Sequence, residues 1–226
     1  MWLTFVNVQI TDVQICKLKI IKMSKYKALI FDLGKVIFEV AFEMAYAHWG
    51  KTGNLDSQEV RSRFRFDEAY DLFSENKMSA EEYAKHVSEM IGINLSQDDF
   101  ETGWNRIYLD TFPGIDKFLV NLKKNYRIVA LTNTNAVHAK VWPSKYAETL
   151  QHFEKVFSSH EMGTRKPEKL AYTMVLDYLN MQASEAIFLD DTIENIIGAD
   201  DLGIKTITVK SSSQMISDLR KTGIEI

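Results

Sequence analysis

The amino-acid sequence predicts an α/β protein in which a doubly wound parallel sheet carries an inserted helical cap. After Pro113-Gly114, short apolar segments with strand character alternate with helical segments. This alternation is typical of right-handed parallel crossovers. Between the first apolar segment and Pro113, residues 41–108 carry mainly helical signals. The predicted domains are therefore a core of residues 23–40 and 109–226 and a cap of residues 41–108.

Residues 1–22 precede the first expected strand. Apolar residues alternate in part of this segment as they would in a strand or hairpin, but polar residues interrupt the stretch and its lysines lie at the wrong end for a secretory signal. We interpret residues 1–22 as a dispensable extension, with Met23 as a point where a compact chain could begin. The alternative is that this segment is an integral strand.

The first half of the chain is expected to hold one strand and then the cap helices. Residues 26–33 are an apolar run that ends near an aspartate, which suits a buried parallel strand. Cap helices are expected over residues 43–49, 61–73, 79–90 and 96–108. Ser79 and Glu82 form a capping box for the third of these helices, and Ser96 caps the fourth.

The second half is expected to complete the sheet. Helices are predicted over residues 115–124, 146–151, 167–179 and 194–202, and strands over residues 126–131, 153–157, 186–189 and 205–209. Pro167 suits the first turn of its helix, and Gly203 suits the end of the last one.

Composition narrows the classes of partner. The 226 residues are 46% hydrophobic and 26% charged, with a formal net charge of −4. A mildly acidic chain without a Lys/Arg cluster gives no electrostatic reason to bind nucleic acid, and no apolar run is long enough to cross a bilayer. Cys16 is the single cysteine, which is compatible with a reducing compartment. We expect a cytoplasmic protein with a small-molecule partner, and the sequence does not indicate its oligomeric state.

Polar side chains follow several expected strands or precede a helix. They are Asp32, Thr132, Lys166 and the pair Asp190-Asp191. Because the carboxyl ends of parallel strands meet at one edge of a sheet, we expect these side chains to converge. Carboxylates, a hydroxyl and an ammonium are the groups that hold Mg²⁺ and a phosphoryl group. The pattern therefore predicts phosphoryl transfer through an aspartyl nucleophile.

Four segments in this order resemble the haloacid dehalogenase-like hydrolase superfamily over residues 26–210. They are Phe31-Asp32-Leu33-Gly34, Leu131-Thr132-Asn133, Arg165-Lys166-Pro167 and Leu189-Asp190-Asp191. Within the superfamily the chain is similar to sugar phosphatases of the alpha-D-glucose-1-phosphate phosphatase type. That similarity lies in residues 131–135 with His138 and Trp142-Pro143, and in Glu68-Ala69-Tyr70 and Gly103-Trp104. The resemblance implies a Rossmann-like sheet and a Mg²⁺-dependent enzyme.

The resemblance also implies roles for the acidic residues. Asp32 would be the nucleophile, although an isolated aspartate at a strand end can also simply cap a turn. Asp32, Asp191 and the Gly34 carbonyl would hold Mg²⁺. Asp190 would support the site by orienting Asp191 or by hydrogen bonding near Lys166. Asn195 would support the water shell of the metal, or would be an ordinary solvated helix amide.

The remaining strand-end groups are expected to contact the phosphoryl group. The Thr132 hydroxyl and the Asn133 amide would donate hydrogen bonds to it, although a threonine in this position is often only a cap. The Lys166 ammonium would neutralise charge on the nucleophile and on the substrate. Arg165 is expected to face solvent, with contact to the substrate as the alternative.

Gly34 departs from the usual pattern of this superfamily. Most of its phosphatases carry a second aspartate at this position as acid and base, and proton transfer of that kind is typically worth about 10²- to 10⁴-fold in rate. We therefore expect a preference for acidic leaving groups, such as the anomeric hydroxyl of a sugar 1-phosphate. The glycine also argues against a phosphomutase. Lys35 follows and is expected either to face solvent or to touch the phosphate.

Residues that could contact and recognise the leaving group lie in the cap and after the second strand. Glu68, Tyr70 and Trp104 are the cap candidates, with bundle core as the alternative for the two aromatic residues. His138 points at the substrate or is satisfied by its neighbours, and Trp142 is expected to pack the cap against the core.

The sequence thus predicts a Mg²⁺-dependent phosphatase that hydrolyses a small phosphorylated metabolite through an aspartyl-phosphate, with glucose 1-phosphate as an example. A non-catalytic phospho-ligand-binding or interaction protein on the same fold is the competing interpretation. A metal-free dehalogenase ranks lower, because Asp190-Asp191 supplies a magnesium ligand that such an enzyme lacks.

Overall fold

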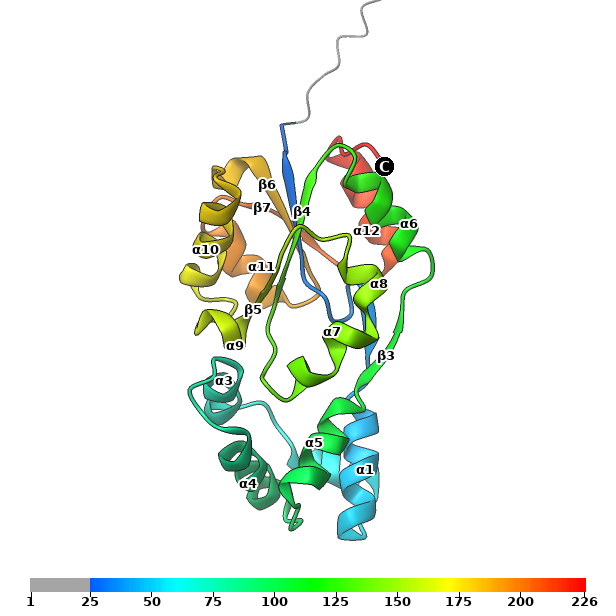
Figure 1. The fold of residues 1–226 in the computed structure, drawn as a ribbon, viewed down its shortest axis with the longest axis vertical. Helices are drawn as coiled ribbons and strands as arrows, with labels where there is room; N and C mark the ends of the chain where they lie inside the picture. Colours follow the sequence, from blue (N-terminus) through cyan, green and yellow to red (C-terminus); the bar gives the residue numbers. More distant parts are fainter. Residues whose placement is uncertain (1–24) are drawn as a thin grey trace, which may run out of the picture.

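A parallel five-stranded sheet forms the centre of the protein. The computed structural model describes residues 25–226, so the interpretation of residues 1–22 and Met23 lies outside the described part (Figure 1). The strands are β1 (Ala28–Phe31), β4 (Arg127–Thr132), β5 (Val156–Ser158), β6 (Ala186–Asp190) and β7 (Lys205–Thr208). Their order is β5-β4-β1-β6-β7, and every pairing is parallel. The predicted doubly wound sheet is confirmed.

Helices cover both faces of the sheet because successive strand side chains point in opposite directions. Leu29 and Phe31 pack towards α6 (Ile115–Leu122) and α12 (Ser212–Lys221). Ile30 lies in the other core cluster, with residues of α10 (Lys169–Leu179) and α11 (Ile193–Asp200). Figure 1 shows these two helix pairs on opposite sides of the sheet.

Five of the six helices between β1 and β4 form a group that lies below the sheet in Figure 1, and this group is called here the helical insertion. They are α1 (Glu43–Gly53), α2 (Ser57–Arg63), α3 (Glu68–Ser74), α4 (Ala80–Ile91) and α5 (Gln97–Asn105). The centre of the insertion is aromatic, with Trp49 stacked on Phe100 and on Trp104. The capping box of Ser79 and Glu82 at the start of α4 is confirmed. The exact division of the chain into core and cap stays a prediction.

Two strands outside the main sheet connect the insertion to the core. β2 (Phe38–Val40) leads into the insertion, β3 (Tyr108–Thr111) leads out of it, and the two pair antiparallel. Neither strand was expected. The predicted helix over residues 96–108 ends at Asn105 because Tyr108 already belongs to β3.

The predicted helix over residues 61–73 is wrong. The chain instead forms α2 and α3, separated by an extended backbone at Phe64 (φ −73°, ψ 139°). The Phe64 ring packs against Tyr46 and Trp49, and Asp67 then caps α3 by accepting a hydrogen bond from the Tyr70 N–H. Burial of an aromatic ring and a new cap therefore outweigh continued helical hydrogen bonding.

The segments around the sheet contain further short elements. They are η1 (His138–Lys140), α7 (Trp142–Lys145), α8 (Ala147–Leu150), α9 (Ser159–Met162) and η2 (Ala183–Glu185). Pro167 lies just before α10 rather than inside it, because Glu168 is the N-cap of that helix. α12 was not predicted. Among residues 25–226, no helix has both the length and the apolar character to span a membrane.

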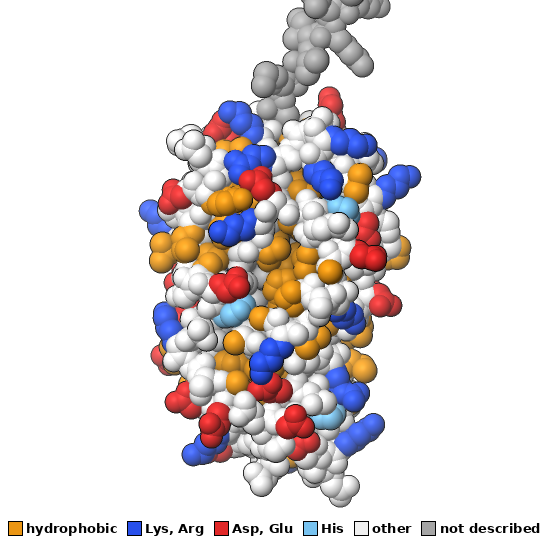
Figure 2. Space-filling model, viewed as in Figure 1, with side chains coloured by type: hydrophobic (Ala, Val, Ile, Leu, Met, Phe, Trp, Pro, Cys, Tyr) orange, Lys and Arg blue, Asp and Glu red, His pale blue; other side chains and the backbone are white. Residues whose placement is uncertain are grey.

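Apolar side chains gather in the middle of the face shown in Figure 2, and charged side chains surround them. In the orientation shared with Figure 1, this region lies at the level where the lower end of the sheet approaches the helical insertion.

Candidate active site

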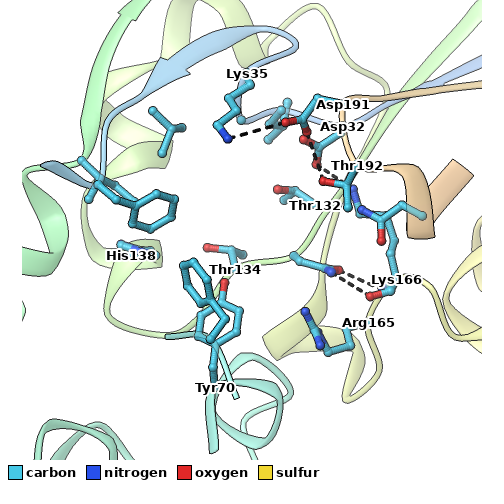
Figure 3. Close-up of a pocket in the computed structure, with 18 of the residues that line it drawn as sticks. Asp32, Lys35, Tyr70, Thr132, Thr134, His138, Arg165, Lys166, Asp191 and Thr192 are labelled. Atoms are coloured by element: carbon cyan, nitrogen blue, oxygen red, sulfur yellow. Dashed lines mark hydrogen bonds and ion pairs between the residues drawn. The ribbon is translucent and has the colours of Figure 1, made fainter. Parts of the chain in front are cut away.

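A pocket of about 680 Å³ lies where the carboxyl ends of the strands face the helical insertion. Asp32 follows β1, Thr132 ends β4 and Asp191 follows β6, so three neighbouring strands deliver side chains to it. Figure 3 shows Asp32, Thr132, Asp191 and Lys166 on one side of this pocket. The structure thus brings together the strand-end residues that the sequence singled out.

Lys166 joins two of the carboxylates. Its side chain is only 1% exposed, and its Nζ lies 2.6 Å from Asp32 Oδ1 and 2.6 Å from Asp190 Oδ2. Burial alone would lower the pKa of Lys166, but the carboxylates of Asp190 and Asp32 outweigh it and raise that pKa. The ammonium is therefore charged and fixed between the two acids.

Asn133 fixes the backbone of Lys166. Its Nδ2 donates to the Lys166 carbonyl at 2.8 Å, and the Lys166 N–H donates to its Oδ1 at 2.9 Å. We expected the Asn133 amide to bind the phosphoryl group. The side-chain amide is instead committed to this reciprocal pair, so the side chain positions Lys166.

Asp190 is a fully buried acceptor that organises the end of β6. Besides Lys166, it accepts hydrogen bonds from the Thr192 N–H at 2.8 Å and from Asn195 Nδ2 at 3.1 Å to each oxygen. Asn195 is also buried, so it is not a solvated helix amide. Of the two supporting roles considered for Asp190, hydrogen bonding to Lys166 is the one that the geometry shows.

Three carboxylates crowd into one cluster at this end of the pocket. Asp32, Asp190 and Asp191 each offer an oxygen, and these oxygens all lie within 4.8 Å of one another. Burial raises the pKa of Asp32 to about 7; Lys166 opposes this effect, and Asp190 and Asp191 add to it. Burial, followed by the charge of Asp190, also raises the pKa of Asp191. Asp32 and Asp191, two hard oxygen donors that resist ionisation on their own, therefore fit a divalent cation such as Mg²⁺.

Gly34 and Lys35 line the same pocket. A Cβ placed on Gly34 would lie 3.2 Å from Val40 Cγ2, so the position has little spare room. The Lys35 ammonium lies 3.8 Å from Asp191 Oδ2, although its side chain is 57% exposed. Lys35 is therefore solvent-exposed, as one of its two alternatives expected, and its contact with a phosphate stays a prediction.

The opposite half of the pocket is largely aromatic. Phe66 and Tyr70 of the insertion line it, with ring centroids 4.6 Å apart, and Tyr108 from β3 lines it as well. The Phe66 side chain is 47% exposed, so its ring offers apolar surface to the pocket. Glu68 also lines the pocket.

Trp104 is not among the residues that line the pocket. It is fully buried in the core of the insertion. The prediction that Trp104 contacts the leaving group is therefore wrong, and its alternative, a place in the core of the helix bundle, is confirmed. His138 lines the pocket and stacks on Trp104 with centroids 5.0 Å apart, while its Nδ1 lies 3.2 Å from Asn105 Oδ1. Burial lowers the pKa of His138 to about 3, so the ring is neutral. Trp142 lines the pocket too.

Arg165 bridges the core and the insertion. Its guanidinium pairs with the Asp71 carboxylate of α3 and lies 5.6 Å from the centroid of the Tyr70 ring. The expectation that Arg165 faces solvent is therefore wrong, since its side chain is only 18% exposed. Asp71 had no signal in the sequence, because its partner lies 94 residues away. A second bridge runs from the Ser159 hydroxyl to the Ser74 carbonyl, at 2.7 Å.

Comparison with known proteins gives consistent matches along the chain. A sequence profile of the family described as haloacid dehalogenase-like hydrolase matches residues 30–209. D-ribitol-5-phosphate phosphatase of Bacteroides thetaiotaomicron is 23% identical over 202 residues, which cover 85% of this chain and 96% of that protein. Glyceraldehyde 3-phosphate phosphatase of Pyrococcus abyssi is 33% identical over 106 residues, 46% of this chain and 44% of that protein.

A solved structure of a HAD family enzyme also resembles this chain. The crystal structure of a HAD family enzyme from Bacteroides thetaiotaomicron, in complex with magnesium and inorganic phosphate, superposes with a TM-score of 0.70 at 28% identity. The superposition covers 83% of this chain and 96% of that enzyme.

Proposed function

The chain belongs to the haloacid dehalogenase-like hydrolases, and from this membership we propose that it is a Mg²⁺-dependent phosphatase of a small phosphorylated metabolite. The observation that carries the proposal is the buried Lys166 ammonium, which lies 2.6 Å from both Asp32 and Asp190, in the same cluster as the Asp191 carboxylate. The names of the two phosphatase relatives and the magnesium and phosphate held by the structural neighbour support it.

Asp32 would act as the nucleophile. One carboxylate oxygen would attack phosphorus, the bond from phosphorus to the leaving oxygen would break with its electron pair going to that oxygen, and water would then hydrolyse the aspartyl-phosphate. Lys166 holds Oδ1 of Asp32 and thereby fixes the orientation of the carboxylate. Its positive charge would also stabilise the oxygens of the transferring group, with the Thr132 hydroxyl donating beside it.

Mg²⁺ would be held by Asp32, Asp191 and the Gly34 carbonyl. When bound, it would supply positive charge that offsets the charge of the phosphoryl group and of the nucleophile. Asp190 would stay outside this set, because its oxygens already accept hydrogen bonds from Lys166, Thr192 and Asn195.

A sugar phosphate with an acidic leaving group is the substrate that we propose. Gly34 brings no proton donor to the leaving oxygen, so an alcohol that departs easily as its anion is favoured. The anomeric hydroxyl of a sugar 1-phosphate, such as glucose 1-phosphate, is more acidic than a primary alcohol. The exposed face of Phe66 and the ring of Tyr70 would pack against the apolar face of a sugar ring.

Hydrolysis of p-nitrophenyl phosphate in the presence and absence of Mg²⁺ tests the activity, because its leaving group needs no acid. We expect Mg²⁺-dependent release of nitrophenol that Asp32→Asn abolishes. Glucose 1-phosphate should then be hydrolysed faster than glucose 6-phosphate. A strong preference for the 6-phosphate would refute the leaving-group argument.

Gly34 also favours a second candidate, a phospho-ligand-binding protein that does not turn its ligand over. In that case phosphorylated metabolites would bind in calorimetry with Mg²⁺ present, while even p-nitrophenyl phosphate would remain intact. Turnover of the aryl phosphate excludes this candidate.

A further inference from the structure

Lys35 has a backbone conformation that its residue type does not favour. Among residues 25–226, four non-glycine residues have a positive φ, and the other three are Asn54, Asn76 and Asn180. Asparagine tolerates the left-handed region, whereas a lysine at φ 59° is disfavoured by contact between its Cβ and the backbone. The turn is held closed by the Lys35 N–H, which donates to the Phe38 carbonyl at 2.7 Å. A strained residue of this kind persists where the surrounding structure enforces it, often at a functional site.

The strained turn places a positive charge on the pocket wall. Figure 3 shows the Lys35 side chain directed at Asp191, with its Nζ 3.8 Å from Oδ2. The other two carboxylates of the cluster, Asp32 and Asp190, share Lys166 as their cation. Lys35 is thus the ammonium that faces the third carboxylate.

The charges of the cluster are nearly matched in this arrangement. Three carboxylates face two ammonium groups, Lys166 and Lys35. Lys166 is buried and bound on both sides, so it cannot leave. Lys35 is more than half exposed and can swing away at little cost, since an exposed ion pair of this kind is weak.

We propose that Lys35 is a built-in counter-ion of Asp191, which a divalent cation must displace in order to bind. The inference rests on the metal site of the proposed function. A divalent cation held by Asp191 and the Lys35 ammonium would lie within a few ångströms of each other, and like charges at such distances repel. Lys35 therefore lowers the affinity of the site for Mg²⁺ below the value that its carboxylates alone would give.

Calorimetric titration with Mg²⁺ at low ionic strength tests this proposal. Lys35→Met removes the charge and keeps the backbone strain, Lys35→Asn removes both, and Lys35→Arg keeps the charge. We expect the Met and Asn variants to bind Mg²⁺ about 3- to 10-fold more tightly than the wild type, and the Arg variant to bind like the wild type. Lys51→Met, on the exposed surface of α1, makes the same change in net charge away from the pocket and should leave the affinity unchanged.

The expected stability of the Lys35→Asn variant ensures that the Mg²⁺ titration can be interpreted. Lys35→Asn should fold at least as stably as the wild type because asparagine tolerates the left-handed backbone, so it decides the question even if Lys35→Met folds poorly. Unchanged or weaker Mg²⁺ binding by the Asn variant would overturn the proposal and leave the phosphatase assignment intact. Absence of Mg²⁺ binding by every protein, the wild type included, would overturn both.

Discussion

Gly34→Asp should supply the proton donor that the pocket lacks at the leaving oxygen. Gly34 does not adopt a positive φ, so an aspartate is compatible with its backbone. The new Cβ would lie 3.2 Å from Val40 Cγ2, and Val40 lines the open pocket and can retreat by a few tenths of an ångström. We expect this contact to cost about 1 kcal/mol of unfolding free energy.

The gain in rate should depend on the leaving group. A well-placed acid contributes about 10²- to 10⁴-fold, which corresponds to about 3–5 kcal/mol of the activation barrier. We expect the lower end of this range for glucose 6-phosphate, because the new carboxylate joins an already acidic cluster and its placement is not optimised. For p-nitrophenyl phosphate, whose leaving group needs no proton, kcat/KM should change by less than about threefold.

The assay is phosphate release at saturating Mg²⁺ and neutral pH for glucose 1-phosphate, glucose 6-phosphate and p-nitrophenyl phosphate. Gly34→Asn is the matched control, since it has the same size and cannot act as a comparable acid. An equal increase for the alkyl and aryl esters, or an increase with the Asn variant as large as with Asp, would show that proton donation is not what position 34 controls.

Three further predictions concern the carboxylate cluster. Asp32→Asn should lower phosphate release by at least about 10³-fold without unfolding the protein, and near wild-type turnover would remove Asp32 from the nucleophile role. Lys166→Met leaves Asp32 and Asp190 buried without their cation, so urea unfolding should show a loss of about 3–5 kcal/mol; a loss below about 1 kcal/mol would contradict the pairing. In the metal-free protein the pKa of Asp32 is about 7 against an ordinary 3.8, so its contribution to stability is full below pH 4 and is lost as the pH rises through 7. Mg²⁺ binding requires the ionised Asp32 carboxylate. Binding should therefore release about one proton at pH 6 and almost none at pH 8.5. Calorimetry in buffers of different ionisation enthalpy measures this number of protons.

The sequence contains enough information for the sheet because each buried parallel strand is a continuous apolar run. β1 reads ALIF and β6 reads AIFLD, and both are fully buried. β2 and β3 were missed because neither is a continuous apolar run: they read FEV and YLDT, and each holds an exposed acidic residue. The segment between α2 and α3 contains no proline or glycine that would have predicted the break. It depends on the packing of Phe64 against rings elsewhere in the insertion.

Some features of the site follow from the local sequence, and others depend on contacts between residues that lie far apart in the chain. Asp32, Thr132 and Asp191 lie at or just after the ends of their strands, so chain order and strand pattern place them. The pairing of Asn133 with the Lys166 backbone and that of Arg165 with Asp71 span 33 and 94 residues. Only the folded chain creates these contacts, and a residue type alone does not reveal its partner.

Residues 66–70 comprise the end of the segment that joins α2 to α3 and the first turn of α3, and they line the pocket without supplying any of its strand-end side chains. In the function that we propose, recognition of the departing alcohol and attack on phosphorus would therefore depend on separate stretches of polypeptide. Randomising residues 66–70 would therefore vary one wall of the pocket, while Asp32, after β1, and Lys166, before α10, stay unchanged.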